Sequence, residues 1–142
     1  MSDPLPAGSL VLLIRLTRRI YRRATEDVLG MRLKSYLLLS NLRDGALPQS
    51  ELCVSMHLDP NNCVLMLNDL EAAGHVERRR DPADRRRHIV VLTPAGRKAL
   101  ASADRAVESL EEEVLGALAP EEREAMRGLL ARALAGEPVP TG

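Results

Sequence analysis

The chain has 142 residues, which is enough for one domain with a buried core. It contains no Phe or Trp and only two Tyr, so aliphatic side chains must fill that core, which favours a mainly helical fold. Lys and Arg balance Asp and Glu at 20 each. Because the net charge is zero, only the distribution of charge can indicate a nucleic-acid partner.

Export and membrane insertion are not expected from the sequence. The apolar run 10–14 is too short for a signal peptide and is followed by arginines. No stretch approaches the length of a membrane span. Two cysteines, Cys53 and Cys63, do not make the disulfide framework of a small secreted domain. We therefore expect a cytoplasmic protein with no membrane partner.

Apolar residues at helical spacing predict four successive helices in the first half of the chain. Their expected ranges are 9–29, 32–42, 48–56 and 60–73. Gly30 is expected to end the first helix. Asp59 and Pro60 form a start signal for the fourth, since Asp can cap free backbone N–H groups and Pro suits the first helical position. Gly74 provides the stop.

The pattern changes at residue 75. Two short runs with Val, Ile and Leu, 75–80 and 87–92, flank the turn 81–84 and predict a β-hairpin. Thr-Pro then begins a helix expected over 94–119, and a last helix is expected over 120–135. The predicted fold is mainly α with a small β-hairpin wing (α+β).

Two of the predicted helices have the spacing of a helix-turn-helix. The helices 49–56 and 60–73 are joined by three residues, so the second can enter a major groove of DNA. Cys53 is expected where the two helices cross, against Cys63. The hairpin that follows carries six arginines within 78–87, and an arginine at its tip can enter the minor groove.

The sequence around the hairpin resembles the signature of the MarR (multiple antibiotic resistance regulator) family. The matching stretches are Leu70-Glu71-Ala72-Ala73-Gly74-His75-Val76-Glu77-Arg78, Asp81-Pro82-Ala83-Asp84-Arg85-Arg86 and Leu92-Thr93-Pro94-Ala95-Gly96. The resemblance extends over roughly residues 10–136. It implies a single domain over 1–142, with dimerisation helices at about 9–30 and 94–136 and a winged helix-turn-helix lobe at about 32–92.

The resemblance also implies a function. Such a chain is expected to be a homodimeric repressor that binds a pseudo-palindromic operator in double-stranded DNA. A small phenolic or carboxylate-like ligand would release it. No enzyme activity, cofactor or metal is expected.

Carried over by position, the residues expected to face DNA are Asn61, Asn62, Leu65, Asn68, Arg85, Arg86 and Arg87. Asp84 is expected to brace the wing through an arginine, and Arg86 to enter the minor groove. The second helix of the pair carries no Lys or Arg, unlike many relatives. Because Asn can pair with adenine through two hydrogen bonds, we expect an A/T-containing half-site, with phosphate affinity supplied mainly by the wing.

The candidate ligand residues are Arg15, Arg18 and Tyr36, which lie near the position where relatives form a ligand pocket. An arginine there can anchor a carboxylate. The plainer interpretation is that the arginines form a solvated face or ion pairs with the acidic stretch 104–124, and that Tyr36 packs in the core.

Other residues have competing interpretations. A disulfide between Cys53 and Cys63 would be expected to deform the DNA-reading helices and act as a redox switch, but the favoured interpretation is two reduced, buried and inert thiols. The three histidines, His57, His75 and His88, lack the paired spacing of a metal site.

Two rival functions are less favoured than a DNA-binding regulator. One is an adapter that uses the winged fold for protein contacts, which only the cation-free helix supports. The other is a thiol-dependent enzyme, which lacks an activated cysteine with a nearby base. In the hairpin, Arg78 and Arg80 could simply pair with Asp81 or Asp84 rather than contact DNA.

Overall fold

The computed structural model describes residues 8–136. Its helices are α1 (Ser9–Arg23), α2 (Glu26–Leu29), α3 (Leu33–Asn41), α4 (Gln49–Ser55), α5 (Pro60–Ala72), α6 (Pro94–Val114) and α7 (Pro120–Ala135). Its strands are β1 (Leu47–Pro48), β2 (Val76–Arg80) and β3 (His88–Leu92). The mainly α fold with a small antiparallel sheet agrees with the prediction.

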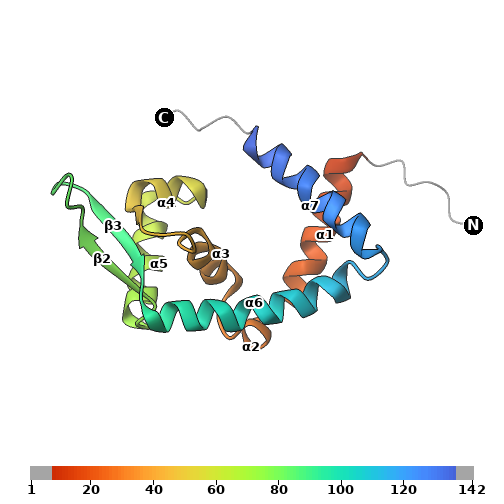
Figure 1. Ribbon diagram of the computed structural model, residues 1–142, viewed down its shortest axis with the longest axis horizontal. Coiled ribbons are helices and arrows are strands. Elements are labelled where there is room, and N and C mark those ends of the chain that lie inside the picture. Colours follow the sequence, from red (N-terminus) through yellow and green to blue (C-terminus); the bar gives the residue numbers. More distant parts are fainter. Residues whose placement is uncertain (1–7, 137–142) are drawn as a thin grey trace, which may run out of the picture.

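The elements separate into two ends joined by the longest helix. Figure 1 shows α4, α5 and the β2–β3 hairpin at one end and α1 and α7 at the other, with α6 running between them. We call the hairpin, residues 76–92, the wing, and the end that contains it the lobe. None of the helices among residues 8–136 is long and apolar enough to cross a membrane.

An aliphatic core holds the lobe together, as the composition predicts. The largest side chains with no exposed surface are Leu38, Leu39, Leu42, Leu52, Leu67 and Val90. Leu42 directly follows α3, and the others come from α3, α4, α5 and β3, so each of these elements contributes to a single buried cluster. Burial of a Leu side chain stabilises a fold by about 1.5–3 kcal/mol. Because α5 and the wing share this core, the core fixes their positions relative to each other.

The sheet contains one strand that the sequence analysis did not predict. The strand order is β1-β3-β2, with every pair antiparallel. In β1, Leu47 pairs with Val90 and Pro48 with Ile89. A two-residue strand carries no periodic pattern, and Pro is tolerated only at a sheet edge, which is where β1 lies.

Two helix boundaries differ from the prediction. The helix expected over 9–29 is broken after Arg23, because Ala24 turns inward with 6% of its surface exposed and Thr25 is extended. A separate short helix, α2, then ends at Gly30, whose φ of 77° is left-handed. The helix expected to reach residue 119 ends at Val114, and the chain turns before α7.

The Thr-Pro-x-Gly segment joins the wing to α6. The Thr93 hydroxyl accepts a hydrogen bond from the Gly96 N–H at 2.9 Å and donates to the Gly74 carbonyl at 2.5 Å. Thr93 thereby caps α6, as predicted. Gly96 is buried, and a Cβ at this position would overlap the carbonyl oxygen of His75. The close contact explains why this position requires glycine.

Candidate DNA-binding surface

The helix-turn-helix forms as predicted. His57 adopts a left-handed φ of 54°, and the Leu58 N–H donates to the Cys53 carbonyl at 3.1 Å, which closes the turn. The Asp59 carboxylate accepts from the Asn62 N–H at 2.9 Å and so caps α5. We call α5 the recognition helix.

The two cysteines form a disulfide bond within this helix pair. The expected proximity of Cys53 and Cys63 is confirmed, but the favoured interpretation of two reduced thiols is wrong. The Cα atoms are 5.7 Å apart, a distance that a disulfide spans without backbone movement. Both helices remain formed, with Leu52 fully buried between them. The disulfide-bonded pair therefore keeps both helices of the DNA-reading unit formed.

The recognition helix exposes fewer free amides than the sequence suggested. The Asn62 side-chain N–H donates to Asp59 at 2.7 Å, and the Asn68 side-chain oxygen accepts from Arg78 at 2.6 Å. Asn61 is exposed, and Leu65 has 61% of its surface exposed. The outward surface of α5 therefore offers an amide and an apolar side chain to a DNA groove.

An ion pair fixes the wing to the recognition helix. The Arg78 guanidinium donates to Glu71 at 2.9 Å, and the Arg78 backbone N–H donates to the other Glu71 oxygen at 3.2 Å. These hydrogen bonds lower the pKa of the Glu71 carboxyl. The suggested pairing of Arg78 with Asp81 or Asp84 is wrong. Glu71 was not predicted as a positioning residue, because its partner Arg78 lies on a different element, β2.

The remaining wing arginines surround a tight turn. The Asp84 carboxylate accepts from the Arg86 N–H at 3.1 Å and from its Nε at 3.4 Å. Arg87 lies 3.5 Å from Asp81, whereas Arg80 donates to a backbone carbonyl in the turn at 2.7 Å and not to either aspartate. The Arg86 side chain is 94% exposed. Asp84 thus orients the backbone of an arginine whose side chain is almost fully exposed to solvent.

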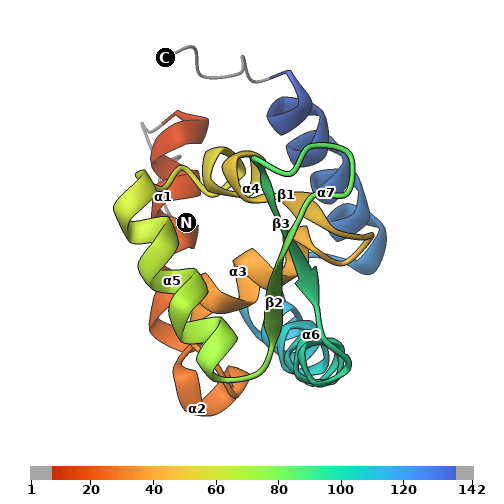
Figure 2. The same ribbon diagram turned by 90° about the vertical axis from the view of Figure 1, so that its left-hand side faces the viewer.

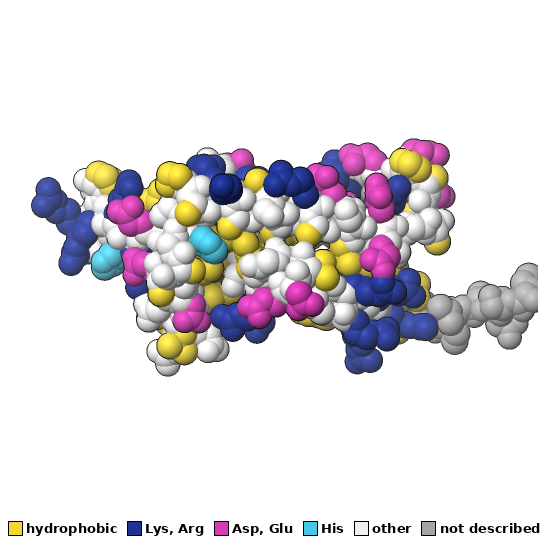
Figure 3. Space-filling view, turned by 90° about the horizontal axis from the view of Figure 1, so that it is seen from below, with side chains coloured by type: hydrophobic (Ala, Val, Ile, Leu, Met, Phe, Trp, Pro, Cys, Tyr) yellow, Lys and Arg dark blue, Asp and Glu magenta, His cyan; other side chains and the backbone are white. Residues whose placement is uncertain are grey.

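The wing and the recognition helix lie at the same end of the molecule, side by side in Figure 2. Figure 3 shows Lys and Arg side chains at that end of the surface. A hollow of about 560 Å³ separates α4 from the wing, and we call it the wing hollow. Its lining includes Cys53, Val64, Arg86 and Arg87. A cationic, concave face of this size suits the backbone of a nucleic acid.

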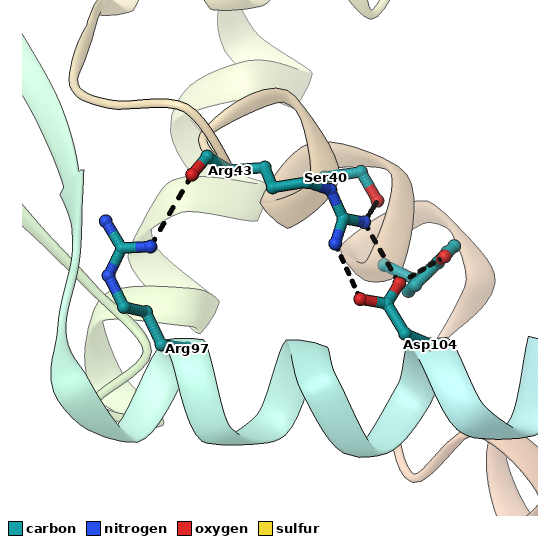
Figure 4. Close-up of polar contacts among 5 residues, drawn as sticks. Ser40, Arg43, Arg97 and Asp104 are labelled. Carbon is teal, nitrogen blue, oxygen red and sulfur yellow. Dashed lines mark hydrogen bonds and ion pairs between the residues drawn. The ribbon is translucent and has the colours of Figure 1, made fainter.

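A polar network connects the lobe to α6 (Figure 4). The Tyr36 hydroxyl donates to Asp104 at 2.7 Å, and the Arg43 guanidinium donates to both Asp104 oxygens, at 2.6 and 3.0 Å. Arg97 donates to the Arg43 carbonyl at 3.5 Å. Arg43 lowers the pKa of the Asp104 carboxyl, while burial and Asp104 raise the pKa of Tyr36. The network fixes α3 against α6.

We expect Asp104→Asn to destabilise the fold by about 1 kcal/mol at neutral pH, since the partly exposed ion pair is weakened. The folded-state pKa of Asp104 is lowered, so its stabilisation is fully present above the unfolded value of about 3.9 and is lost as pH falls through the folded value. Urea unfolding at neutral and acidic pH should therefore show the two proteins converging in acid. Glu124→Gln, at an exposed ion pair on α7, is the control and should change little.

Within residues 8–136, the candidate ligand residues Arg15, Arg18 and Tyr36 line none of three hollows with volumes of about 470, 470 and 560 Å³. Arg15 and Arg18 lie on the exposed surface of α1, and Tyr36 is held by Asp104. A hollow of about 470 Å³ between α1, α6 and α7 has a mainly apolar lining that does not include these residues. At the end of α1, Arg23 forms an ion pair with Glu113, in agreement with the plainer interpretation of this basic helix.

The histidines are dispersed. His57 lies in the turn of the helix pair, His75 precedes β2, and His88 begins β3. Among residues 8–136, no group of three or more His, Cys, Asp or Glu side chains is placed to hold a metal ion.

Comparisons with known proteins agree with this arrangement. The sequence model of the MarR family matches residues 29–87. A putative transcriptional regulatory protein for the hcr operon of Thauera aromatica is 38% identical over 86 residues, which are 61% of this chain and 52% of that protein. The chain spans about half the length of the curated relatives it matches.

Two solved structures share the fold over nearly the whole chain. The crystal structure of MarR superposes with a TM-score of 0.79 at 24% identity, covering 95% of this chain and 94% of that one. BpsR of Bordetella bronchiseptica, whose DNA binding is regulated by 6-hydroxynicotinic acid, gives 0.75 at 25% identity and covers 97% and 100%. Residues 29–87 therefore carry the sequence pattern of the MarR family, and the helix-turn-helix and wing of this chain share the fold of these structures.

Proposed function

We propose that the chain is a transcriptional regulator that binds double-stranded DNA as a homodimer and represses genes at a pseudo-palindromic operator. One observation carries the proposal: the recognition helix and the wing, which carries the exposed Arg86, lie at one end of the molecule. A helix of this kind enters a major groove, while a cationic wing contacts the neighbouring minor groove and phosphates.

The apolar surface at the opposite end supports dimerisation. Large apolar side chains with more than a third of their surface exposed gather on α1 and α7: Leu10, Val11, Leu12, Leu13, Ile14, Ile20, Tyr21, Leu129, Leu130 and Leu134. We call them the apolar end. Exposed apolar side chains gathered in this way are typical of a protein interface. A second copy packed there by a twofold axis would present two recognition helices to successive turns of one DNA face.

We further propose that a small aromatic acid or phenol acts as the effector. BpsR, which responds to 6-hydroxynicotinic acid, supports this chemistry by fold and sequence similarity. Arg15 and Arg18 remain the candidate anchors for a carboxylate. A partner subunit packed on α1 would complete the cavity that a single chain does not form.

A mobility-shift titration against the intergenic DNA upstream of the gene tests the regulator function. Specific binding that weakens steeply with salt is expected, because released counterions supply much of the affinity. A protein that prefers its promoter no more than random DNA would contradict the proposal. That result would favour the rival function, an adapter that uses the winged fold for protein contacts.

We expect Arg86→Ala to weaken operator binding by about 1–3 kcal/mol, roughly 5- to 150-fold, since its exposed guanidinium loses a groove contact. If the Arg86 contact includes a phosphate, the slope of log affinity against log salt concentration should become shallower by about one. Arg79→Ala is the matched control in the same wing, because Arg79 pairs with Glu77 at 3.1 Å. Equal effects of the two substitutions across salt concentrations would refute the role of Arg86.

A further inference from the structure

The disulfide lies in the helix pair that the proposed function uses to contact DNA, and its two cysteines differ in access. Cys63 has no exposed surface. Cys53 is half-buried and lines the wing hollow. A dissolved thiol or disulfide therefore reaches Cys53 first.

We propose that Cys53 is a thiol-exchange site and that the buried Cys63 is its resolving cysteine. Oxidation of the pair then ends in the intramolecular disulfide, in which α4 and α5 stay formed, and not in a bulky adduct facing DNA. The regulatory consequence rests on the proposed function, whereas the order of the chemical steps does not.

The reaction begins from the two thiols and a small disulfide, R–S–S–R. The Cys53 thiolate attacks one sulfur, a mixed disulfide forms on Cys53, and RS⁻ leaves and takes up a proton. Cys63 then loses its proton and attacks the Cys53 sulfur, and the second RS⁻ leaves. The two protein thiols are oxidised to one disulfide, and one R–S–S–R is reduced to two R–SH. The 5.7 Å between the Cα atoms allows the second step without helix movement.

The surroundings of Cys53 favour an anionic reagent. Arg86 and Arg87 line the same hollow, and their guanidinium groups attract a negatively charged disulfide such as glutathione disulfide. An adduct left on Cys53 would occupy the hollow between α4 and the wing. It would hold the lobe away from the DNA backbone, so clearing it by Cys63 preserves DNA binding.

The test treats the reduced full chain and two variants, Cys63→Ala and Cys53→Ala, with glutathione disulfide, and locates adducts by peptide mass spectrometry. The wild type should form the internal disulfide with little lasting adduct. Cys63→Ala should hold the adduct on Cys53, and Cys53→Ala should react at least tenfold more slowly. Alanine keeps the buried site apolar, and circular dichroism checks that each variant is folded. Equal rates of adduct formation at the two cysteines, or a lasting adduct on the wild type, would overturn the assignment.

The second part of the test measures DNA binding. It uses a duplex that the untreated protein has selected from a pool of random sequences. Glutathione disulfide should change the wild-type Kd by less than threefold but raise that of Cys63→Ala at least tenfold, and bound DNA should slow adduct formation on Cys63→Ala. An adduct-bearing variant that binds DNA as tightly as the untreated one would overturn the inference. If no untreated protein enriches DNA, the proposed function fails, and adduct mapping still decides the order of the two cysteines.

Discussion

Replacing Leu129 with Asp is expected to dissociate the proposed dimer. Leu129 lies in the apolar end with 61% of its surface exposed in a single chain. Burying an unpaired carboxylate in an interface costs several kcal/mol, and a twofold interface contains the substitution twice. We expect the dimer dissociation constant to rise at least about a thousandfold, which corresponds to about 4 kcal/mol. Sedimentation across a concentration series measures this directly, and operator binding should fall with it.

Leu65→Asp is the matched control, since Leu65 is also 61% exposed but lies on the recognition helix. It should leave the dimer intact and abolish operator binding, because a carboxylate would face the phosphates. The two variants therefore separate assembly from DNA contact. A Leu129→Asp protein that stays dimeric at nanomolar concentration would place the interface elsewhere.

The sequence was sufficient for most of the fold because its local signals were strong. Asp59-Pro60 and Thr93-Pro94 each combine a capping side chain with a proline at the first helical position, and both helices begin where predicted. The break after Arg23 has no such signal. Ala24 is a good helix former that turns inward only because tertiary packing buries it, so the apolar periodicity continues through the break.

The candidate site was harder to predict because side chains compete for partners. The sequence places Asn62 and Asn68 on the recognition helix but does not show that Asp59 and Arg78 occupy their amides. The cysteine pair shows the same limit. Helix spacing predicted that Cys53 and Cys63 lie in contact, whereas the common behaviour of buried cysteines as small, inert hydrophobic side chains favoured the wrong oxidation state.

Gly96→Ala is expected to destabilise the fold by about 3 kcal/mol or more, the upper range for an overpacked interior. The new Cβ would overlap the backbone carbonyl of His75, which cannot rotate away as a side chain could. That carbonyl also accepts from the Thr93 N–H at 3.1 Å, so moving it disturbs the junction of the wing and α6. Thermal unfolding should show a Tm lowered by about 10 °C.

Gly128→Ala provides the control, because Gly128 lies within α7 with no atom within 4 Å of a Cβ. Alanine is favoured over glycine in a helix interior by up to about 1 kcal/mol, so this substitution should be neutral or stabilising. The two substitutions should change the stability in opposite directions. This difference separates the steric overlap at Gly96 from the general effect of replacing a helical glycine. If Gly96→Ala unfolded at the wild-type temperature, the wing would not be held to α6 by this contact, and its position beside the recognition helix would depend on the buried core and on the ion pair of Arg78 with Glu71.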